Sequence, residues 1–270
     1  MYGIEEGLID WNFSIFDEGF FTLPEDGRIY RDWKEGGHGN TNLFKAITQS
    51  SNTYFFNLAY RSDINQLNKH LLSLGFGDKA CIDCFEEDKV FVPEPSWKMN
   101  KHNFGWFKGD TVNMGVGQGY LVSTPVQLAK YAYIMANKGK FSDLSLKKDL
   151  VKSEKSIEFN KFSNDDWFKL HESMINVIEG NTGTARRLRE KKNYIVAAKT
   201  GTAELVSGDN REQYSETRLD DNLRDHALII AFGPMPNPRY AVSVVVENGE
   251  SGGSVAGPVA ISVLNSLIQE

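Results

Sequence analysis

Two short groups of residues carry side chains that could support acyl-transfer chemistry. Ser50 and Asn52 flank Ser51, and the tetrapeptide Lys-Thr-Gly-Thr occupies residues 199–202. Hydroxyls, an ammonium and a carboxamide are groups with which enzymes hold a carboxylate, move protons and stabilise an oxyanion. These two groups therefore matter only if the fold brings residues near 50 and near 199 together.

The first group interrupts a predicted helix. Apolar residues recur at helical spacing over residues 42–61, but residues 49–52 place Ser50 and Ser51 on the apolar stripe. A buried hydroxyl needs a hydrogen-bond partner or lines a cleft. The alternatives are a continuous buried helix, with the serines bonded to the preceding turn, and a simple helix break.

The second group ends a predicted strand. A glycine in a strand interior often marks the close approach of a ligand or of another backbone. An edge strand of this kind could bind an extended peptide, with Lys199 and the neighbouring hydroxyls taking a carboxylate. The alternative is an ordinary strand with a bulge at Gly201.

The remaining pattern indicates helices first and antiparallel strands last, which is an α+β arrangement. Helices are predicted over residues 63–74, 124–137, 167–178 and 260–268, and strands over 194–203, 226–233 and 239–247. Residues 140–166 are rich in lysine, serine and aspartate, which is typical of a mobile surface insertion. No internal repeat occurs.

The two groups stand in the order found in serine acyltransferases, which combine Ser-x-x-Lys, Ser-x-Asn and Lys-Thr-Gly motifs. The flanks that carry the likeness are residues 30–38, 109–120, 123–128, 197–203 and 225–226. On these residues the whole chain resembles the C-terminal part of a penicillin-binding protein transpeptidase domain of the cell-elongation type.

The resemblance implies an incomplete fold of the penicillin-binding protein and serine β-lactamase type. We expect an antiparallel sheet with the C-terminal helix packed on it, plus a helical subdomain. The domain would span residues 1–270, with a helical part at about 1–180, a sheet part at about 190–270 and the mobile insertion at about 140–166.

The resemblance also implies the reaction. In such enzymes a serine attacks the penultimate D-alanine carbonyl of a peptidoglycan stem peptide, and the acyl group then passes to an amine on a neighbouring strand. β-Lactams imitate the substrate. By resemblance, Ser50 would relay protons to the leaving amine, and Asn52 would hydrogen-bond the substrate amide.

The Lys-Thr-Gly-Thr segment would hold the other end of the substrate. By resemblance, Lys199 supplies positive charge, while Thr200 and Thr202 grip the substrate carboxylate on either side of Gly201. The backbone N–H of Thr202 would serve the oxyanion hole. No cofactor is required for this chemistry.

The nucleophile of the family lies on a Ser-x-x-Lys motif well before Ser-x-Asn, and no such motif occurs between Met1 and Ser50. We expect it to have been cut off ahead of Met1, so that this chain alone is inactive. The one match, Ser145-Leu-Lys-Lys, follows Ser-x-Asn and is interpreted as a chance occurrence.

A metal site is the second implication of the resemblance. In many relatives a structural zinc ion is held by two aspartates, a histidine and the cysteine inside the Ser-x-Asn triplet. Asp17, Asp32 and His38 match the first three, and Ser51 stands where those relatives have the cysteine. A neutral serine is a poor replacement for a thiolate. The alternative is that Asp32 and His38 only hydrogen-bond the glycine-rich loop.

Composition limits the partners. Hydrophobic residues make up 40% of 270, and 30 basic against 36 acidic residues give a net charge of −6, which disfavours nucleic acid and anionic membranes. No run of about 18 apolar residues occurs, and the start does not read as a secretion signal. The two cysteines are interpreted as an ordinary pair, close enough to oxidise together in an oxidising compartment.

The resemblance implies peptidoglycan stem peptides and β-lactams as ligands, and a glycosyltransferase of the elongation machinery as a partner. Full-length relatives sit at the periplasmic face of the inner membrane through an N-terminal anchor absent here, so this chain alone would stay cytoplasmic. We also expect exposed apolar surface and marginal stability from the missing first part.

Two alternatives to the transpeptidase remain. One is a non-catalytic remnant that binds a peptide or a partner. The other is a penicillin-hydrolysing or penicillin-sensing relative, against which the long loop at residues 205–224 argues.

Overall fold

A three-stranded antiparallel sheet carries the Lys-Thr-Gly-Thr segment. The computed structural model describes residues 1–148, 150, 153–205 and 221–269. Strands β7 (Ala197–Ala203), β8 (His226–Gly233) and β9 (Tyr240–Val246) lie in the order β7-β8-β9. They agree closely with the predicted strands, and β8 and β9 form the expected hairpin. Among the described residues, β7 lies at the edge of this sheet and pairs with a strand only on its β8 side.

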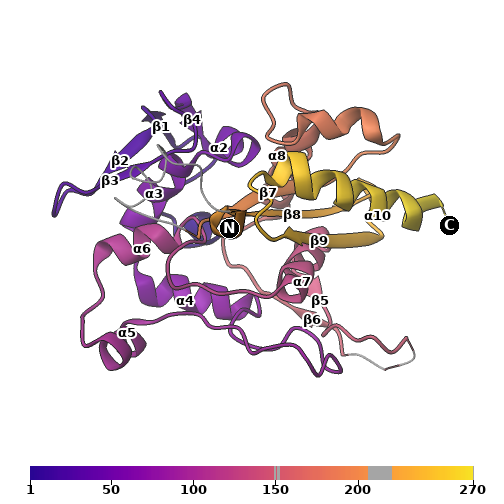
Figure 1. Cartoon of the computed structure of the whole chain (residues 1–270), viewed down its shortest axis with the longest axis horizontal. Helices are drawn as coiled ribbons and strands as arrows, with labels where there is room; N and C mark the ends of the chain where they lie inside the picture. The colour runs from indigo at the N-terminus through magenta and orange to yellow at the C-terminus, as the bar shows by residue number, and fades with distance from the viewer. Residues whose placement is uncertain (149, 151–152, 206–220, 270) are drawn as a thin grey trace.

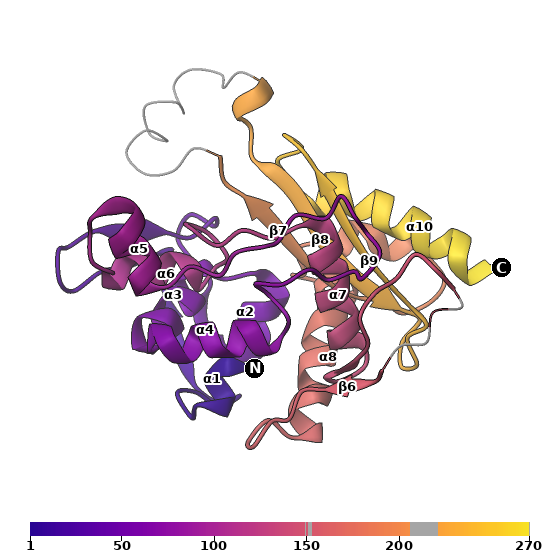
Figure 2. The same ribbon diagram turned by 90° about the horizontal axis from the view of Figure 1, so that it is seen from below.

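Helices cover both faces of this sheet. Figure 2 shows α10 (Gly257–Gln269) along one face, with α7 (Pro125–Ala136) and α8 (Asn164–Glu179) on the other. Side chains of successive strand residues point to opposite faces. Accordingly, Ala197 belongs to the core cluster under α7 and α8, whereas Ala198 belongs to the cluster under α10. The predicted packing of a C-terminal helix on an antiparallel sheet is thus confirmed.

The N-terminal part holds short strands that the sequence pattern did not indicate. Strand β1 (Ser14–Asp17) pairs with β4 (Gly39–Asn42), and β2 (Phe20–Thr22) pairs with β3 (Ile29–Arg31), both antiparallel. At three or four residues each, these strands are too short to show a periodic pattern. In Figure 1 they lie on the opposite side of the molecule from α10.

The other elements are mostly helical. They are α1 (Tyr2–Glu5), α2 (Leu43–Gln49), α3 (Asn52–Arg61), α4 (Ile64–Ser73), α5 (Pro95–His102), α6 (Lys108–Met114), β5 (Lys140–Phe141), β6 (Lys155–Ser156), the 3-10 helices η1 (Arg186–Lys191) and η2 (Asp221–Leu223), and the π-helical turn η3 (Gly252–Ala256). Helices α4, α7, α8 and α10 match the predicted positions.

Two predicted segments are only partly described. In the expected insertion at residues 140–166, β5 pairs with β6, and Asp143 contacts both Lys130 and Lys155. Residues 149, 151 and 152 lie outside the described residues, and the mobility of this segment stays a prediction. Most of the loop at residues 205–224 also lies outside the described part of the chain.

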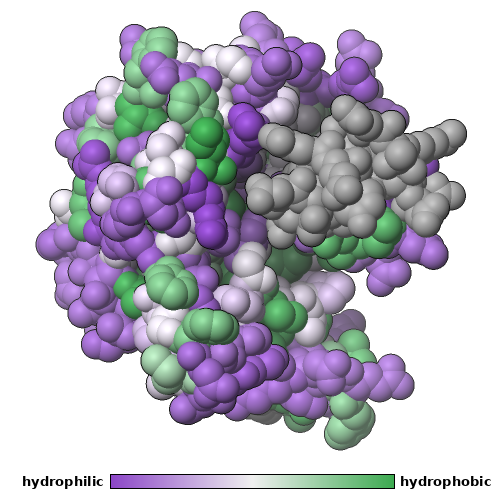
Figure 3. All heavy atoms as spheres, turned by 60° about the vertical axis from the view of Figure 1, so that its left-hand side comes forward, coloured by the Kyte–Doolittle hydropathy of each residue, from purple (hydrophilic) through white to green (hydrophobic). Residues whose placement is uncertain are grey.

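The surface carries scattered apolar side chains. On the face shown in Figure 3, hydrophobic residues form separate small patches among hydrophilic ones. The exposed aromatic residues include Phe16 and Trp33, at 66% and 60% of their full accessible area. Among the described residues, no helix combines the length and the apolar character that crossing a bilayer requires.

Close backbone contact at Gly252 fixes the turn that covers β7 and β8. A Cβ atom added there would overlap the carbonyl oxygen of Leu228 and lie 2.6 Å from that of Gly201. Gly201 itself is less crowded: the nearest atom to a Cβ added there is Leu228 Cβ at 3.4 Å.

We predict that Gly252→Ala lowers the free energy of unfolding by about 1–3 kcal/mol, because the added methyl group has to push backbone apart. Gly105→Ala is the matched control, since the nearest atom to its added Cβ is Met99 Cε at 4.0 Å, and its effect should stay within about 1 kcal/mol. Denaturant titration measures both values; equal losses would contradict the prediction.

Candidate active site and metal-ligand cluster

Ser50 lies in a sharp turn between α2 and α3. Its φ and ψ are 58° and 45°, in the left-handed region, which costs a residue with a side chain about 1–3 kcal/mol and persists only where surroundings enforce it. The next residue, Ser51, is the N-cap of α3 and accepts a hydrogen bond from Tyr54 N at 3.2 Å. Of the two alternatives for this segment, the structure shows the helix break: α2 and α3 are separate, capped helices.

The exposed side chain of Trp33 stabilises this turn by hydrogen bonds. Its indole N–H donates to the carbonyl oxygens of Gln49 and Ser50, at 3.2 and 2.9 Å. These carbonyls belong to the end of α2, where they have no intrahelical partner. The indole thus satisfies the helix end and holds the backbone that orients Ser50.

Lys199 reaches Ser50 from the edge of the sheet. Its Nζ donates to Ser50 Oγ at 2.6 Å and to the carbonyl oxygen of Thr200 at 2.8 Å. Burial lowers the pKa of Lys199 to about 8, because a buried ammonium loses its hydration. The structure therefore brings together the two groups that the sequence singled out.

The threonines of β7 have different partners. Thr200 Oγ1 shares a hydrogen bond of 2.7 Å with Thr184 Oγ1. Thr202 Oγ1 is 3.4 Å from the carbonyl oxygen of Glu250. Thr202 also accepts a hydrogen bond at its own carbonyl oxygen, from Gln118 Nε2 at 2.8 Å.

Asn52 is the half-buried first residue of α3, two residues after Ser50. Ser145 lies elsewhere: its Oγ donates to Asp83 Oδ2 at 2.8 Å. Asp83 sits between Cys81 and Cys84, which form a disulfide. The Ser145 motif is thus held by the disulfide loop.

Asp17, Asp32 and His38 form one buried cluster. Each offers a ligand atom, and the three atoms lie within 4.8 Å of one another. Ser51 adjoins the cluster, because its Oγ donates to Asp17 Oδ2 at 2.7 Å. All four residues of the predicted metal-ligand set are therefore adjacent.

Hydrogen bonds orient the cluster. Burial opposes the charged forms, but the contact between His38 and Asp32 outweighs it, raising the pKa of His38 and lowering that of Asp32. Thr53 N–H also donates to Asp32 Oδ2 at 3.0 Å. His38 Nδ1 faces Gln49 Oε1 at 2.9 Å, while Nε2 faces Asp32 Oδ1 at 3.3 Å.

Glycine at position 37 permits this arrangement. Its φ is +70°, and a Cβ added there would overlap the carbonyl oxygen of Asp17 and the backbone nitrogen of Gly19. Only a residue without a side chain allows such close approach in this conformation. The loop before His38 can therefore pack directly on the end of β1.

Sequence reasoning assigned no role to several neighbours of the site. Trp33 and Gln118 lie within the flanks at residues 30–38 and 109–120, which carried the resemblance without a stated function. Thr182 and Thr184 lie outside every motif of the sequence. In the structure Thr182 Oγ1 accepts a hydrogen bond from Gln49 Nε2 at 3.0 Å. A search for polar residues beside the Ser-x-Asn motif could have found only Gln49.

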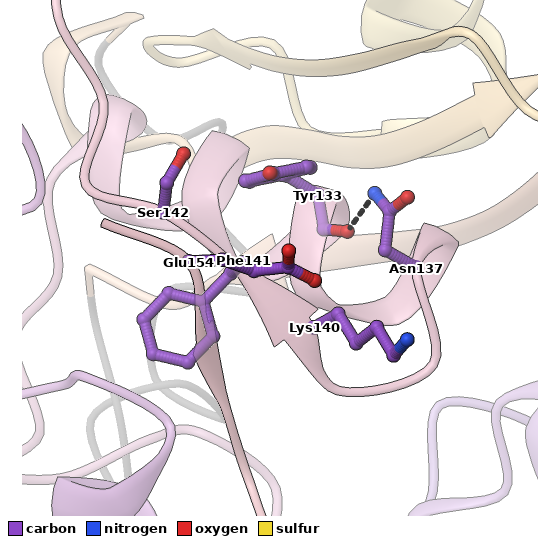
Figure 4. A pocket seen from close by; sticks show the side chains of 6 residues that line it. All are labelled: Tyr133, Asn137, Lys140, Phe141, Ser142 and Glu154. Carbon is purple, nitrogen blue, oxygen red and sulfur yellow. Dashed lines mark hydrogen bonds between the residues drawn. The ribbon is translucent and has the colours of Figure 1, made fainter. Parts of the chain in front are cut away.

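A separate shallow pocket of about 290 Å³ lies at the end of α7 and the start of β5 (Figure 4). It is lined by Tyr133, Asn137, Lys140, Phe141, Ser142 and Glu154. None of these residues belongs to the Ser50–Lys199 site or to the cluster of Asp17, Asp32 and His38. The pocket is therefore separate from the candidate acyl-transfer site.

Comparison with known proteins identifies relatives of this chain. Its residues 1–265 match the family described as penicillin binding protein transpeptidase domain. It is 38% identical over 265 residues to peptidoglycan D,D-transpeptidase MrdA of Acinetobacter baumannii, covering 95% of this chain and 39% of that protein. With MrdA of Haemophilus influenzae the identity is 36%, covering 98% and 42%.

Solved structures agree. Pseudomonas aeruginosa PBP2, in complex with WCK 5153, superposes with a TM-score of 0.88 at 33% identity, covering 100% of this chain and 58% of that one. Helicobacter pylori PBP2, in a complex with MreC, gives a TM-score of 0.87 at 30% identity, covering 99% and 48%. The chain spans about two fifths of the length of the curated relatives cited above. The chain belongs to the penicillin-binding protein transpeptidase domain family.

Proposed function

We propose that this chain provides the peptide-binding and proton-transfer elements of a peptidoglycan D,D-transpeptidase. The observation that carries the proposal is the 2.6 Å hydrogen bond between Lys199 Nζ and Ser50 Oγ. It joins the Ser-x-Asn turn to the edge of the Lys-Thr-Gly strand. The match to MrdA proteins supports the reaction type, although the chain covers only part of them.

In this proposal the edge of β7 receives the carboxylate end of a stem peptide. We assign Thr184 as the donor in its hydrogen bond with Thr200 Oγ1, which leaves the Thr200 hydroxyl free to donate to the carboxylate. Lys199 adds positive charge, and Thr202 contributes its hydroxyl and its backbone N–H. Together these donors hold a carboxylate and stabilise developing negative charge.

Ser50 carries the proton. Because the pKa of Lys199 is about 8, part of its amine is unprotonated near neutral pH. Lys199 can therefore exchange a proton with the hydroxyl that it contacts. Ser50 can therefore pass a proton between Lys199 and the leaving amine. Asn52, at the start of α3, binds the substrate amide.

We place the nucleophile outside these 270 residues, since residues 1–50 contain no Ser-x-x-Lys motif. In this proposal the chain alone binds a peptide or a β-lactam without forming an acyl-enzyme. The protein in which the domain works would act in the periplasm, and the Cys81–Cys84 disulfide supports an oxidising compartment. Helicobacter pylori PBP2 forms a complex with MreC, which supports a partner from the elongation machinery; the glycosyltransferase implied by the family resemblance is a second candidate.

We also propose a zinc ion at the buried cluster. The carboxamide oxygen of Gln49 can only accept, so Nδ1 of His38 donates to it; once the ring gives up its second proton, the Nε2 lone pair points toward Asp32 Oδ1. His38 Nε2 and Asp32 Oδ1 are then two acceptors that face each other with no donor between them, beside the buried carboxylate of Asp17. A cation bound between them would remove this repulsion. Asp17, Asp32 and His38 would hold the ion, with the Ser51 hydroxyl in the fourth position. Its role would be structural.

We predict that the chain binds a peptide ending in D-alanyl-D-alanine without covalent labelling by fluorescent penicillin. Thr200→Val should weaken peptide binding about tenfold to a hundredfold, because a hydrogen bond to a charged group is lost. Calorimetry measures the affinity, and gel fluorescence detects the label.

Thr22→Val, at an exposed threonine of β2, is the control and should bind like the unmodified chain. Equal affinity in the Thr200 variant would contradict the proposed carboxylate site. Stable labelling of the chain would contradict the placement of the nucleophile outside it.

Peptide affinity should be constant up to about pH 8 and then fall by as much as about tenfold per pH unit. The affinity falls because the carboxylate of the peptide binds the protonated form of Lys199. In the free protein this form is lost as the pH rises above the pKa of Lys199. Binding isotherms from pH 6 to pH 10 test this. Lys199→Met should bind more weakly and show no such break; a break that survives in this variant would refute the assignment.

Ser51→Cys should raise zinc affinity by about tenfold or more, because a thiolate replaces a neutral hydroxyl among the ligands. Competition with a chromophoric chelator measures the affinity. Ser62→Cys is the matched control, since Ser62 is also a buried serine but lies outside the cluster. Zinc content far below one equivalent in both the unmodified chain and Ser51→Cys would remove the zinc proposal.

A further inference from the structure

Gln118 is displayed by a glycine-flanked turn after α6. Gly117 and Gly119 both have a φ of +78°, a conformation that glycine adopts at no steric cost. The backbone N–H of Gln118 donates to the carbonyl oxygen of Asn113 at 3.0 Å. The turn therefore holds the side chain of Gln118 in a defined direction.

That side chain lies against the edge of β7. Its Nε2 donates to the carbonyl oxygen of Thr202 at 2.8 Å, and its Oε1 accepts from Glu204 N at 3.4 Å. The opposite edge of β7 pairs with β8. A carboxamide offers one donor side and one acceptor side, as a peptide unit does. Gln118 thus occupies the place of a neighbouring strand.

The other groups of the site lie along the same edge. The carbonyl groups of residues two apart in a strand point the same way, so those of Thr200 and Thr202 share the unpaired edge. Lys199 Nζ contacts the first, and Gln118 contacts the second. A peptide whose carboxylate sits at Thr200 and which continues toward Glu204 meets Gln118.

We propose that Gln118 is a specificity-determining residue: its carboxamide holds the Thr202 carbonyl in the free protein and gives way to the amide N–H of a bound peptide. This inference rests on the proposed peptide site. A ligand with an N–H at that position displaces Gln118 and takes over its hydrogen bond to the carbonyl, whereas an ester analogue has no N–H to donate and leaves Gln118 in place. Gln118 therefore lowers the affinity only of ligands that donate to the Thr202 carbonyl.

The experiment compares two ligands and two variants. The ligands are an N-acetylated tripeptide ending in D-alanyl-D-alanine and the same compound with an ester oxygen replacing the amide nitrogen of the penultimate residue. Gln118→Met keeps the length of the side chain but removes both hydrogen bonds. It should bind the amide ligand about two- to tenfold more tightly, since nothing has to be displaced, and should leave ester binding unchanged.

Gln66→Met, at an exposed glutamine in the first turn of α4, is the matched control and should change neither affinity. Hydrogen exchange at the backbone N–H of Glu204 gives a readout without ligand: it should be faster in Gln118→Met than in the control. Thermal melting of each variant checks that it is folded.

The outcomes separate the two proposals. Binding of both ligands with an unchanged amide-to-ester ratio in Gln118→Met, or weaker amide binding, would overturn the role of Gln118 alone. Unchanged exchange at Glu204 would overturn the edge contact itself. If the unmodified chain bound neither ligand while Thr200→Val behaved identically, the proposed peptide site would fall and this inference with it.

Discussion

The hydrogen bond between the Lys199 amine and the Ser50 hydroxyl is the constraint on which the candidate site depends. It requires a half-buried lysine on the sheet to meet a serine on a turn between helices. Burying an amine costs free energy unless polar atoms receive it, and here Ser50 Oγ and the Thr200 carbonyl do so. Removing Ser50 Oγ would leave the half-buried amine with one hydrogen bond fewer.

Both sides of this contact are fixed by backbone packing. On the helical side, Trp33 holds the carbonyls at the end of α2, and the loop at Gly37 lies directly on the end of β1. On the sheet side, Gly252 lies against the backbone of β7 and β8. Rigid backbone at these places positions Ser50 and Lys199 better than long side chains could.

Much of this arrangement could be predicted from sequence because it rests on local signals. The polar run at Ser50 marked an irregularity in the helical pattern without deciding between a continuous helix and a break, and the apolar runs in the last third predicted β7, β8 and β9. Motif order then placed Ser50 and Lys199 in one site. The strands β1 to β4 gave no signal because each is only three or four residues long. The contacts of Trp33, Gln118 and Thr184 depend on tertiary geometry between elements far apart in the chain, which no local pattern encodes.

The sequence separation of the central contact bears on how the protein folds. Ser50 and Lys199 are 149 residues apart, so their contact closes a very long loop, and such contacts form slowly and late. The helices on one side and the strands on the other can form earlier from nearby residues. We therefore expect the Ser50–Lys199 contact to be among the last to form, and a ligand that bridges the pair to stabilise only molecules in which it has formed.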